Sequence, residues 1–186
     1  MIADHDRSGW FGASDTAQIM RSWETDTFRR WWAEKLGLQP RKYNSRAMYA
    51  GTYYEHRILD AVGVTQRDRQ ILLPELRLRV NLDGEDANGV VEVKTYKAGK
   101  EFKPTSAYRQ QVNVQMYARR IADGAPERGR IVSYGLTDED YADFFRPVDP
   151  ARIEWHEIEY DAPFIERYLE RLKRLRDALE RGVWPT

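Results

Sequence analysis

The hydrophobic positions along the chain change their spacing twice. Residues 25–36 and 44–62 have the pattern of helices, and Thr25 and Asn44 are residue types that cap helix N-termini. From residue 66 onwards, apolar and polar positions alternate with a period of two, which is typical of strands. This alternation predicts strands at residues 66–73, 76–83 and 89–95.

Helical spacing returns at residues 105–122 and again after Pro163, where apolar side chains form one stripe of an amphipathic helix. Between these two helices, residues 129–136 and 152–160 have the pattern of further strands. The order of the elements predicts one α/β domain over residues 1–186, in which helices flank a central mixed β-sheet.

The composition is that of a globular protein and excludes several classes. Charged residues make up 32% of the 186 residues and hydrophobic residues 41%, with a formal net charge of zero. No apolar run approaches the roughly 18 residues of a membrane helix, and the N-terminal residues lack the pattern of a secretory signal. The absence of cysteine excludes disulfides and thiolate-held clusters. We therefore expect a cytoplasmic protein with no membrane partner, located in the host cytoplasm if it is viral.

The candidate chemistry lies in the strand pattern between Asp83 and Lys94. Glu92 and Lys94 project from one face of their strand, and pairing across the intervening turn brings Asp83 close to both. Two carboxylates and the Val93 carbonyl provide the oxygen ligands that Mg²⁺ prefers, with an ammonium beside them to orient water and stabilise charge on a phosphate. The alternative is an exposed hairpin whose Glu92–Lys94 pair is ordinary surface charge.

A third carboxylate is offered by the helix at residues 44–62. Gly51 lies four residues before Glu55, and a glycine in a helix interior suggests close approach by another backbone. Glu55 lies one turn later on the same face, from which it could reach the metal. The alternative is that Glu55 is a solvent-facing acid of this helix.

In their order along the chain, these residues resemble the PD-(D/E)XK nuclease superfamily, and in particular its branch of phage lambda exonuclease, YqaJ viral recombinase and RecB-like nucleases. The residues that carry the resemblance are Gly51, Glu55, Asp83, Gly84, Glu92, Val93, Lys94 and Gln111. The resemblance implies a restriction-endonuclease-like core that uses Mg²⁺ or Mn²⁺ to hydrolyse DNA. It also implies that Asp83, Glu92 and Glu55 bind metal, that Lys94 is the catalytic lysine, and that Gln111 contacts a water or the DNA end.

The resemblance further suggests contacts to DNA. Arg7 and Ser14 fall where the lambda-type enzymes hold the 5′-phosphate of their substrate, and Ser14 or Asp15 is expected to cap a first helix. Lys97 and Arg109 belong to a locally basic stretch that suits a DNA backbone, although such a stretch is also typical of a solvated loop.

Two of the departures from the pattern of this family concern histidine and cysteine. RecB-like members often carry a histidine before the helix glutamate, whereas His56 follows Glu55 here and is not assigned as a ligand. The cysteines of the iron–sulfur subgroup are missing.

The resulting hypothesis is a metal-dependent DNA nuclease, specifically a phage-type exonuclease of recombination or repair. One alternative is a structure-specific or restriction-like endonuclease on the same fold. Another is a DNA-binding recombination partner that does not cut. The expected partners are DNA, a single-strand annealing protein and further copies of the chain.

Overall fold

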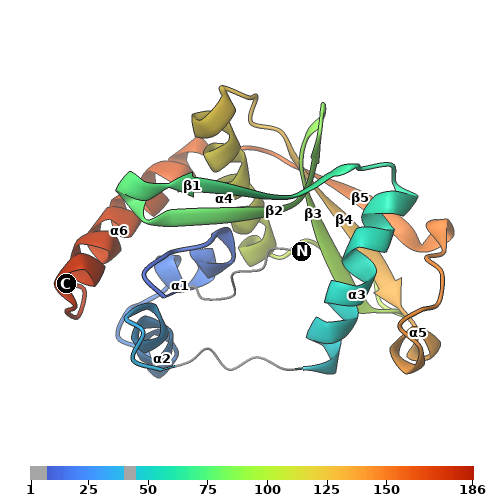
Figure 1. Ribbon diagram of the computed structural model, residues 1–186, viewed down its shortest axis with the longest axis horizontal. Helices are drawn as coiled ribbons and strands as arrows, with labels where there is room; N and C mark the ends of the chain where they lie inside the picture. Colours follow the sequence, from blue (N-terminus) through green and yellow to red (C-terminus); the bar gives the residue numbers. More distant parts are fainter. Residues whose placement is uncertain (1–7, 40–44) are drawn as a thin grey trace.

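A single mixed sheet forms the centre of the molecule (Figure 1). The computed structural model describes residues 8–39 and 45–186. The strand order in the sheet follows the chain, and all neighbouring strands are antiparallel except β3 and β4. The strands are β1 (Gln66–Leu73), β2 (Leu78–Asp86), β3 (Gly89–Lys97), β4 (Gly129–Leu136) and β5 (Ile153–Ile158). The predicted mixed sheet flanked by helices is confirmed.

Helices cover both faces of this sheet. The α-helices are α1 (Thr16–Met20), α2 (Asp26–Lys35), α3 (Arg46–Ala61), α4 (Ser106–Asp123), α5 (Asp138–Ala142) and α6 (Ala162–Arg181). The short 3₁₀ helices are η1 (Ala13–Asp15), η2 (Pro74–Leu76) and η3 (Pro150–Arg152). Parallel neighbours need a crossover connection, and α4 provides it between β3 and β4.

The sheet separates two hydrophobic clusters. On one face, Tyr54 and Ile58 of α3 pack with Val91 and Val93 of β3, and Figure 1 shows α3 beside these strands. On the other, α4 and α6 pack together with α1 and the remaining strands. Helix α4 approaches β4 so closely that a Cβ at Gly129 would lie 2.6 Å from the Val112 side chain. The glycine therefore sets the depth at which α4 sits on the sheet.

Several helix ends agree with the sequence patterns. Thr25 caps α2 by accepting a hydrogen bond from the Phe28 N–H at 3.2 Å, and Thr105 caps α4 in the same way. Helices α4 and α6 both end at a glycine with positive φ, Gly124 and Gly182.

Other ends differ. Helix α3 begins at Arg46, and its cap is Ser45, which accepts from the Met48 N–H at 3.2 Å; the expected cap, Asn44, lies outside the described residues. The side chain of Asp15 does not cap α1, because it accepts from Gly12 and from Lys35 instead. Helix α5 was not expected from the pattern.

Within the described part of the chain, no helix combines the length and apolar character needed to cross a bilayer.

Candidate active site

The site begins where β2 and β3 separate. The two strands pair only at Gly84–Val91, Glu85–Val90 and Asp86–Gly89, after which β2 continues along β1 and β3 along β4. The gap is bridged by the Val93 N–H, which donates to Asp83 Oδ2 at 2.8 Å. The N–H and C=O of one strand residue point to the same side, so the Val93 carbonyl also faces this gap.

Glu92 and Lys94 project from β3 towards α4. The Lys94 ammonium donates to Glu92 Oε1 at 2.5 Å and to Gln111 Oε1 at 3.3 Å. The Gln111 amide donates to the same Glu92 oxygen at 2.6 Å. Glu92 is only 2% exposed, so the pair is not the ordinary surface charge that the alternative interpretation required.

Glu55 approaches from α3, and the electrostatics show that it belongs to the same group of charges. Burial and, after it, the Glu92 carboxylate raise the pKa of Glu55 from 4.5 to about 6, although His56 opposes the shift. Burial, Glu92 and Glu55 together raise the pKa of Asp83 well above its usual value. Glu55 is therefore not a freely solvated helical acid.

Lys94 is a cation in this setting. Burial alone lowers the pKa of its ammonium, but Glu92 and Asp83 more than compensate and leave the pKa above its usual value. The ammonium also lies 4.8 Å from the centre of the Tyr108 ring, a favourable position for a cation. Lys94 can therefore stabilise negative charge and orient water, but it is not suited to take a proton.

The chemistry of the donor set suits a divalent cation. Carboxylates from Glu55, Asp83 and Glu92 face one ammonium, so negative charge is in excess and is partly removed from water. Carboxylate and carbonyl oxygens are the ligands that Mg²⁺ and Mn²⁺ prefer. The Val93 carbonyl can complete this set on the same side of β3.

Glu55 also belongs to a second acidic group. Ligand atoms of Glu55, His56 and Asp68 all lie within 4.8 Å of one another, and His56 Nε2 is 3.0 Å from Asp68 Oδ2. Asp68 lies in β1 with a left-handed φ of 57°, a conformation that aspartate tolerates better than most residues. The structure thus places His56 beside a candidate metal ligand although the sequence did not assign it.

Gly51 does not have the role expected from the sequence. A Cβ at this position would lie 3.4 Å from the Thr95 hydroxyl, which is ordinary van der Waals contact. Its nearest neighbour is a side chain of β3 rather than another backbone, so a small side chain would fit here.

The residues predicted to bind DNA lie on the surface or outside the described residues. Exposed Lys97 pairs with Asp138 at 3.0 Å, and exposed Arg109 donates to the Pro104 carbonyl at 3.4 Å in the first turn of α4. Ser14 is exposed in η1. Arg7 lies outside the described residues. The partners of Lys97 and Arg109 are therefore residues outside the carboxylate group.

Sequence reasoning missed two residues around Glu92 and Lys94. Gln115 donates to Glu92 Oε2, and the ring of Tyr108 faces Lys94. Helical geometry could have indicated Gln115, because it follows Gln111 by four residues and therefore shares its face of α4.

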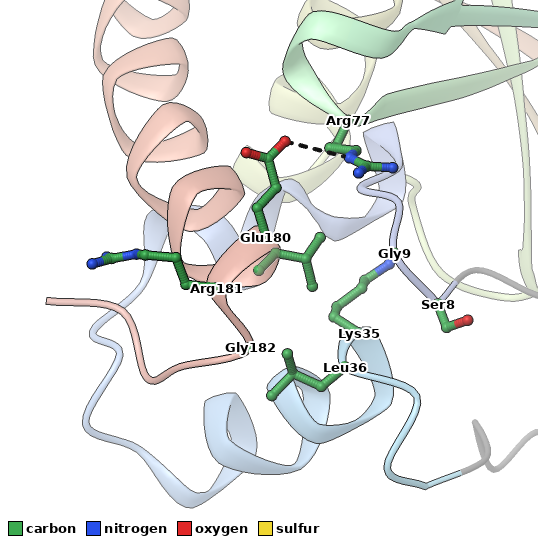
Figure 2. Close-up of a pocket in the computed structure, with 9 residues that line it drawn as sticks. Ser8, Gly9, Lys35, Leu36, Arg77, Glu180, Arg181 and Gly182 are labelled. Atoms are coloured by element: carbon green, nitrogen blue, oxygen red, sulfur yellow. Dashed lines mark ion pairs between the residues drawn. The ribbon is translucent and has the colours of Figure 1, made fainter.

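A separate cleft of about 570 Å³ lies on another part of the molecule (Figure 2). It is bounded by the ends of α2 and α6 and by the segment before β2, where Arg77 and Glu180 form an ion pair at 3.6 Å. Both partners are half-exposed, so the pair adds little stability. None of the active-site carboxylates lines this cleft.

No protein-family model matches the chain, and no curated protein is significantly similar to it. Solved structures are similar, however. An alkaline exonuclease (LHK-Exo) from Laribacter hongkongensis superposes with a TM-score of 0.69 at 23% identity, over 95% of this chain and 90% of that one. A phage-related exonuclease from Haemophilus somnus 129PT gives a TM-score of 0.70 at 14% identity, over 93% and 94% of the two chains.

This chain has the fold of these exonuclease structures. The same alkaline exonuclease in complex with dAMP is also similar, with a TM-score of 0.69 at 21% identity. Each likeness covers at least 93% of this chain, which contains the sheet and α3 with the carboxylate group and α4 with Gln111.

Proposed function

We propose that this chain is a metal-dependent DNA exonuclease of phage type, acting in recombination or repair as one domain over residues 1–186. The observation that carries the proposal is the convergence of Glu55, Asp83 and Glu92 around Lys94, at the point where β2 and β3 separate. The likeness to exonuclease structures supports the same reaction class.

Asp83, Glu92, Glu55 and the Val93 carbonyl would hold Mg²⁺ or Mn²⁺. A bound divalent cation would polarise a phosphate oxygen and lower the pKa of an attacking water. Lys94 orients that water and stabilises the negative charge that grows on the phosphate as its bond to the leaving oxygen breaks. Glu92 and Asp83 raise the pKa of the Lys94 ammonium above the usual value, which favours the charged form.

Gln111 acts as a catalytic residue beside Lys94. Its amide contacts both the Lys94 ammonium and Glu92 Oε1, so it can hold the lysine in place and present an amide to water or to the DNA end. Towards the surface, we assign Arg7, Ser14, Lys97 and Arg109 to the DNA backbone and its terminal phosphate. Further proposed partners are a single-strand annealing protein and additional copies of this chain.

The test is cleavage of a linear duplex labelled at one end, incubated with Mg²⁺ and compared with an EDTA control. Loss of label from the end, with a closed circle left intact, supports an exonuclease. Cutting of the circle would instead favour the endonuclease on the same fold.

A Lys94→Ala variant serves as the matched protein control. It should bind DNA and remain folded but cut at a strongly reduced rate, because the charge on the phosphate loses its partner. Near-normal turnover would rule out the assigned role. A wild-type protein that binds DNA but never cuts would favour the non-catalytic alternative, against which the retention of Glu55, Asp83, Glu92 and Lys94 argues.

A further inference from the structure

Both oxygens of Glu92 are engaged, but by residues of different kinds. Oε1 accepts from Lys94 and Gln111, the two groups that the proposed mechanism uses. Oε2 accepts from the side-chain amide of Gln115, which is 1% exposed. The same amide nitrogen lies 3.5 Å from the Asn81 carbonyl of β2. Gln115 therefore connects α4 to both strands that border the site.

Only one orientation of the Gln115 amide satisfies Glu92. Turning the amide over would place its oxygen against the Glu92 carboxylate, where two acceptors repel each other. In the orientation that remains, Gln115 Oε1 is buried without a hydrogen-bond partner among the described residues. A buried polar atom without a partner weakens a fold, so a core residue would not retain it for packing alone.

From these contacts we propose that Gln115 is a positioning residue, which fixes Glu92 through Oε2 so that Oε1 is the oxygen presented to the cation site. The inference rests on the proposed function. It assigns different roles to two glutamines one turn apart on α4: Gln111 contacts Lys94 directly, whereas Gln115 acts only through Glu92.

The test is a titration of the protein with Mn²⁺ in the absence of DNA. The electron paramagnetic resonance signal of free Mn²⁺ measures how much of the ion is bound. Gln115→Met keeps the length of the side chain but removes the donor. We expect a dissociation constant raised about tenfold or more, which is the usual effect of removing a group that orients a metal ligand. Gln110→Met, on another face of α4, is the matched control and should bind as wild type does. A dissociation constant within twofold of wild type in Gln115→Met overturns the inference.

A second variant separates positioning from misfolding. Gln115→Asn retains a polar amide in the core but is one methylene too short to reach Glu92, so it should weaken Mn²⁺ binding as Gln115→Met does. Damage to the fold would lower the number of sites per chain and leave the dissociation constant of the remaining sites unchanged. That result in either variant overturns the positioning role.

Cleavage distinguishes this inference from the proposed function. A wild-type chain that binds Mn²⁺ but leaves linear DNA intact refutes the nuclease and leaves the role of Gln115 standing. A wild-type chain that cuts DNA, with an unchanged Mn²⁺ dissociation constant in both Gln115 variants, refutes only the role of Gln115.

Discussion

Asp15 and Asp83 are both withdrawn from water, yet their surroundings act on them in opposite directions. Asp15 is 3% exposed and forms an ion pair with Lys35 at 2.6 Å, while the Gly12 N–H and the Trp31 indole donate to the same carboxylate. Burial alone would raise the pKa of Asp15, but Lys35 and these donors lower it below its usual value. Lys35, Trp31 and Gly12 thus stabilise the charged form of Asp15.

Asp83 has the opposite environment. Burial, Glu92 and Glu55 raise its pKa well above the usual value, and the nearby Lys94 only partly compensates. Within the fold, the charge of Asp15 is balanced by Lys35, so Asp15 contributes to stability. Asp83 lies in a group of carboxylates whose excess negative charge a bound cation would neutralise. The direction of the pKa shift therefore separates a structural acid, Asp15, from the acid that we propose to bind metal, Asp83.

The comparison predicts its largest effect at Asp83. Asp83→Asn keeps an acceptor for the Val93 N–H but removes a metal-binding charge, so cleavage should fall about 10³-fold or more. Thermal stability without metal should be unchanged or slightly higher, because Glu92 and Glu55 lose a repulsive neighbour. Cleavage of end-labelled duplex and thermal unfolding measure the two effects. Normal turnover would show that Asp83 is not a ligand.

Lys35→Met should affect stability instead. It leaves the Asp15 carboxylate buried without its partner, which costs about 3–5 kcal/mol in the free energy of unfolding. Urea unfolding measures this loss, and the fraction that remains folded should still cut DNA. Lys97→Met is the control: it breaks an ion pair of similar length whose partners are 67% and 82% exposed, and no measurable loss is expected. If Lys35→Met and Lys97→Met lowered the free energy of unfolding equally, burial would not distinguish the two ion pairs.

The pH dependence of stability should differ between the two regions. The native state holds a proton on Glu55 more tightly than the unfolded chain does, because its pKa rises from 4.5 to about 6. The contribution of Glu55 to the free energy of unfolding therefore falls by roughly 1–2 kcal/mol as the pH rises from 4.5 to about 6. The lowered pKa of Asp15 acts the other way: its contribution is present above the usual aspartate pKa and is lost as the pH falls through the lower native value.

Binding of Mn²⁺ should make the titration of Glu55 and Asp83 measurable. Stabilisation by Mn²⁺ should be greater at pH 7 than at pH 5, because protons compete with the cation for Glu55 and Asp83. Melting temperatures with and without Mn²⁺ at the two pH values test this expectation. Glu55→Gln should reduce the difference in Mn²⁺ stabilisation between the two pH values. A melting-temperature shift on Mn²⁺ binding that does not depend on pH would argue against carboxylate ligands.

The smallest effects are expected at the surface. Lys97→Ala and Arg109→Ala should each weaken DNA binding a few-fold and reduce the slope of affinity against salt by about one. Neither should alter the stability of the Asp15 or Asp83 regions. Binding isotherms at several salt concentrations measure the slope, and an unchanged slope would remove these residues from the DNA contacts.

Local patterns predicted much of the fold because they depend on near neighbours. Strand β4 occupies residues 129–136, as its alternation indicated, and α2 starts after Thr25. The sequence patterns failed where contacts between residues far apart in the chain determine the local structure. The Asp15 side chain forms an ion pair with Lys35 and does not cap α1. Helix α5 depends on a capping box between Thr137 and Asp140 that the apolar pattern does not reveal.

The sequence by itself determined the order of the reactive groups, and its period of two indicated that a turn would bring Asp83 near Glu92 and Lys94. Only the tertiary structure decided that β2 and β3 separate there, and that α3 and α4 bring Glu55, Gln111 and Gln115 to the gap. The physical reason is that the stability of a charge depends on burial and on the charges packed around it. Spacing along the chain does not encode these properties.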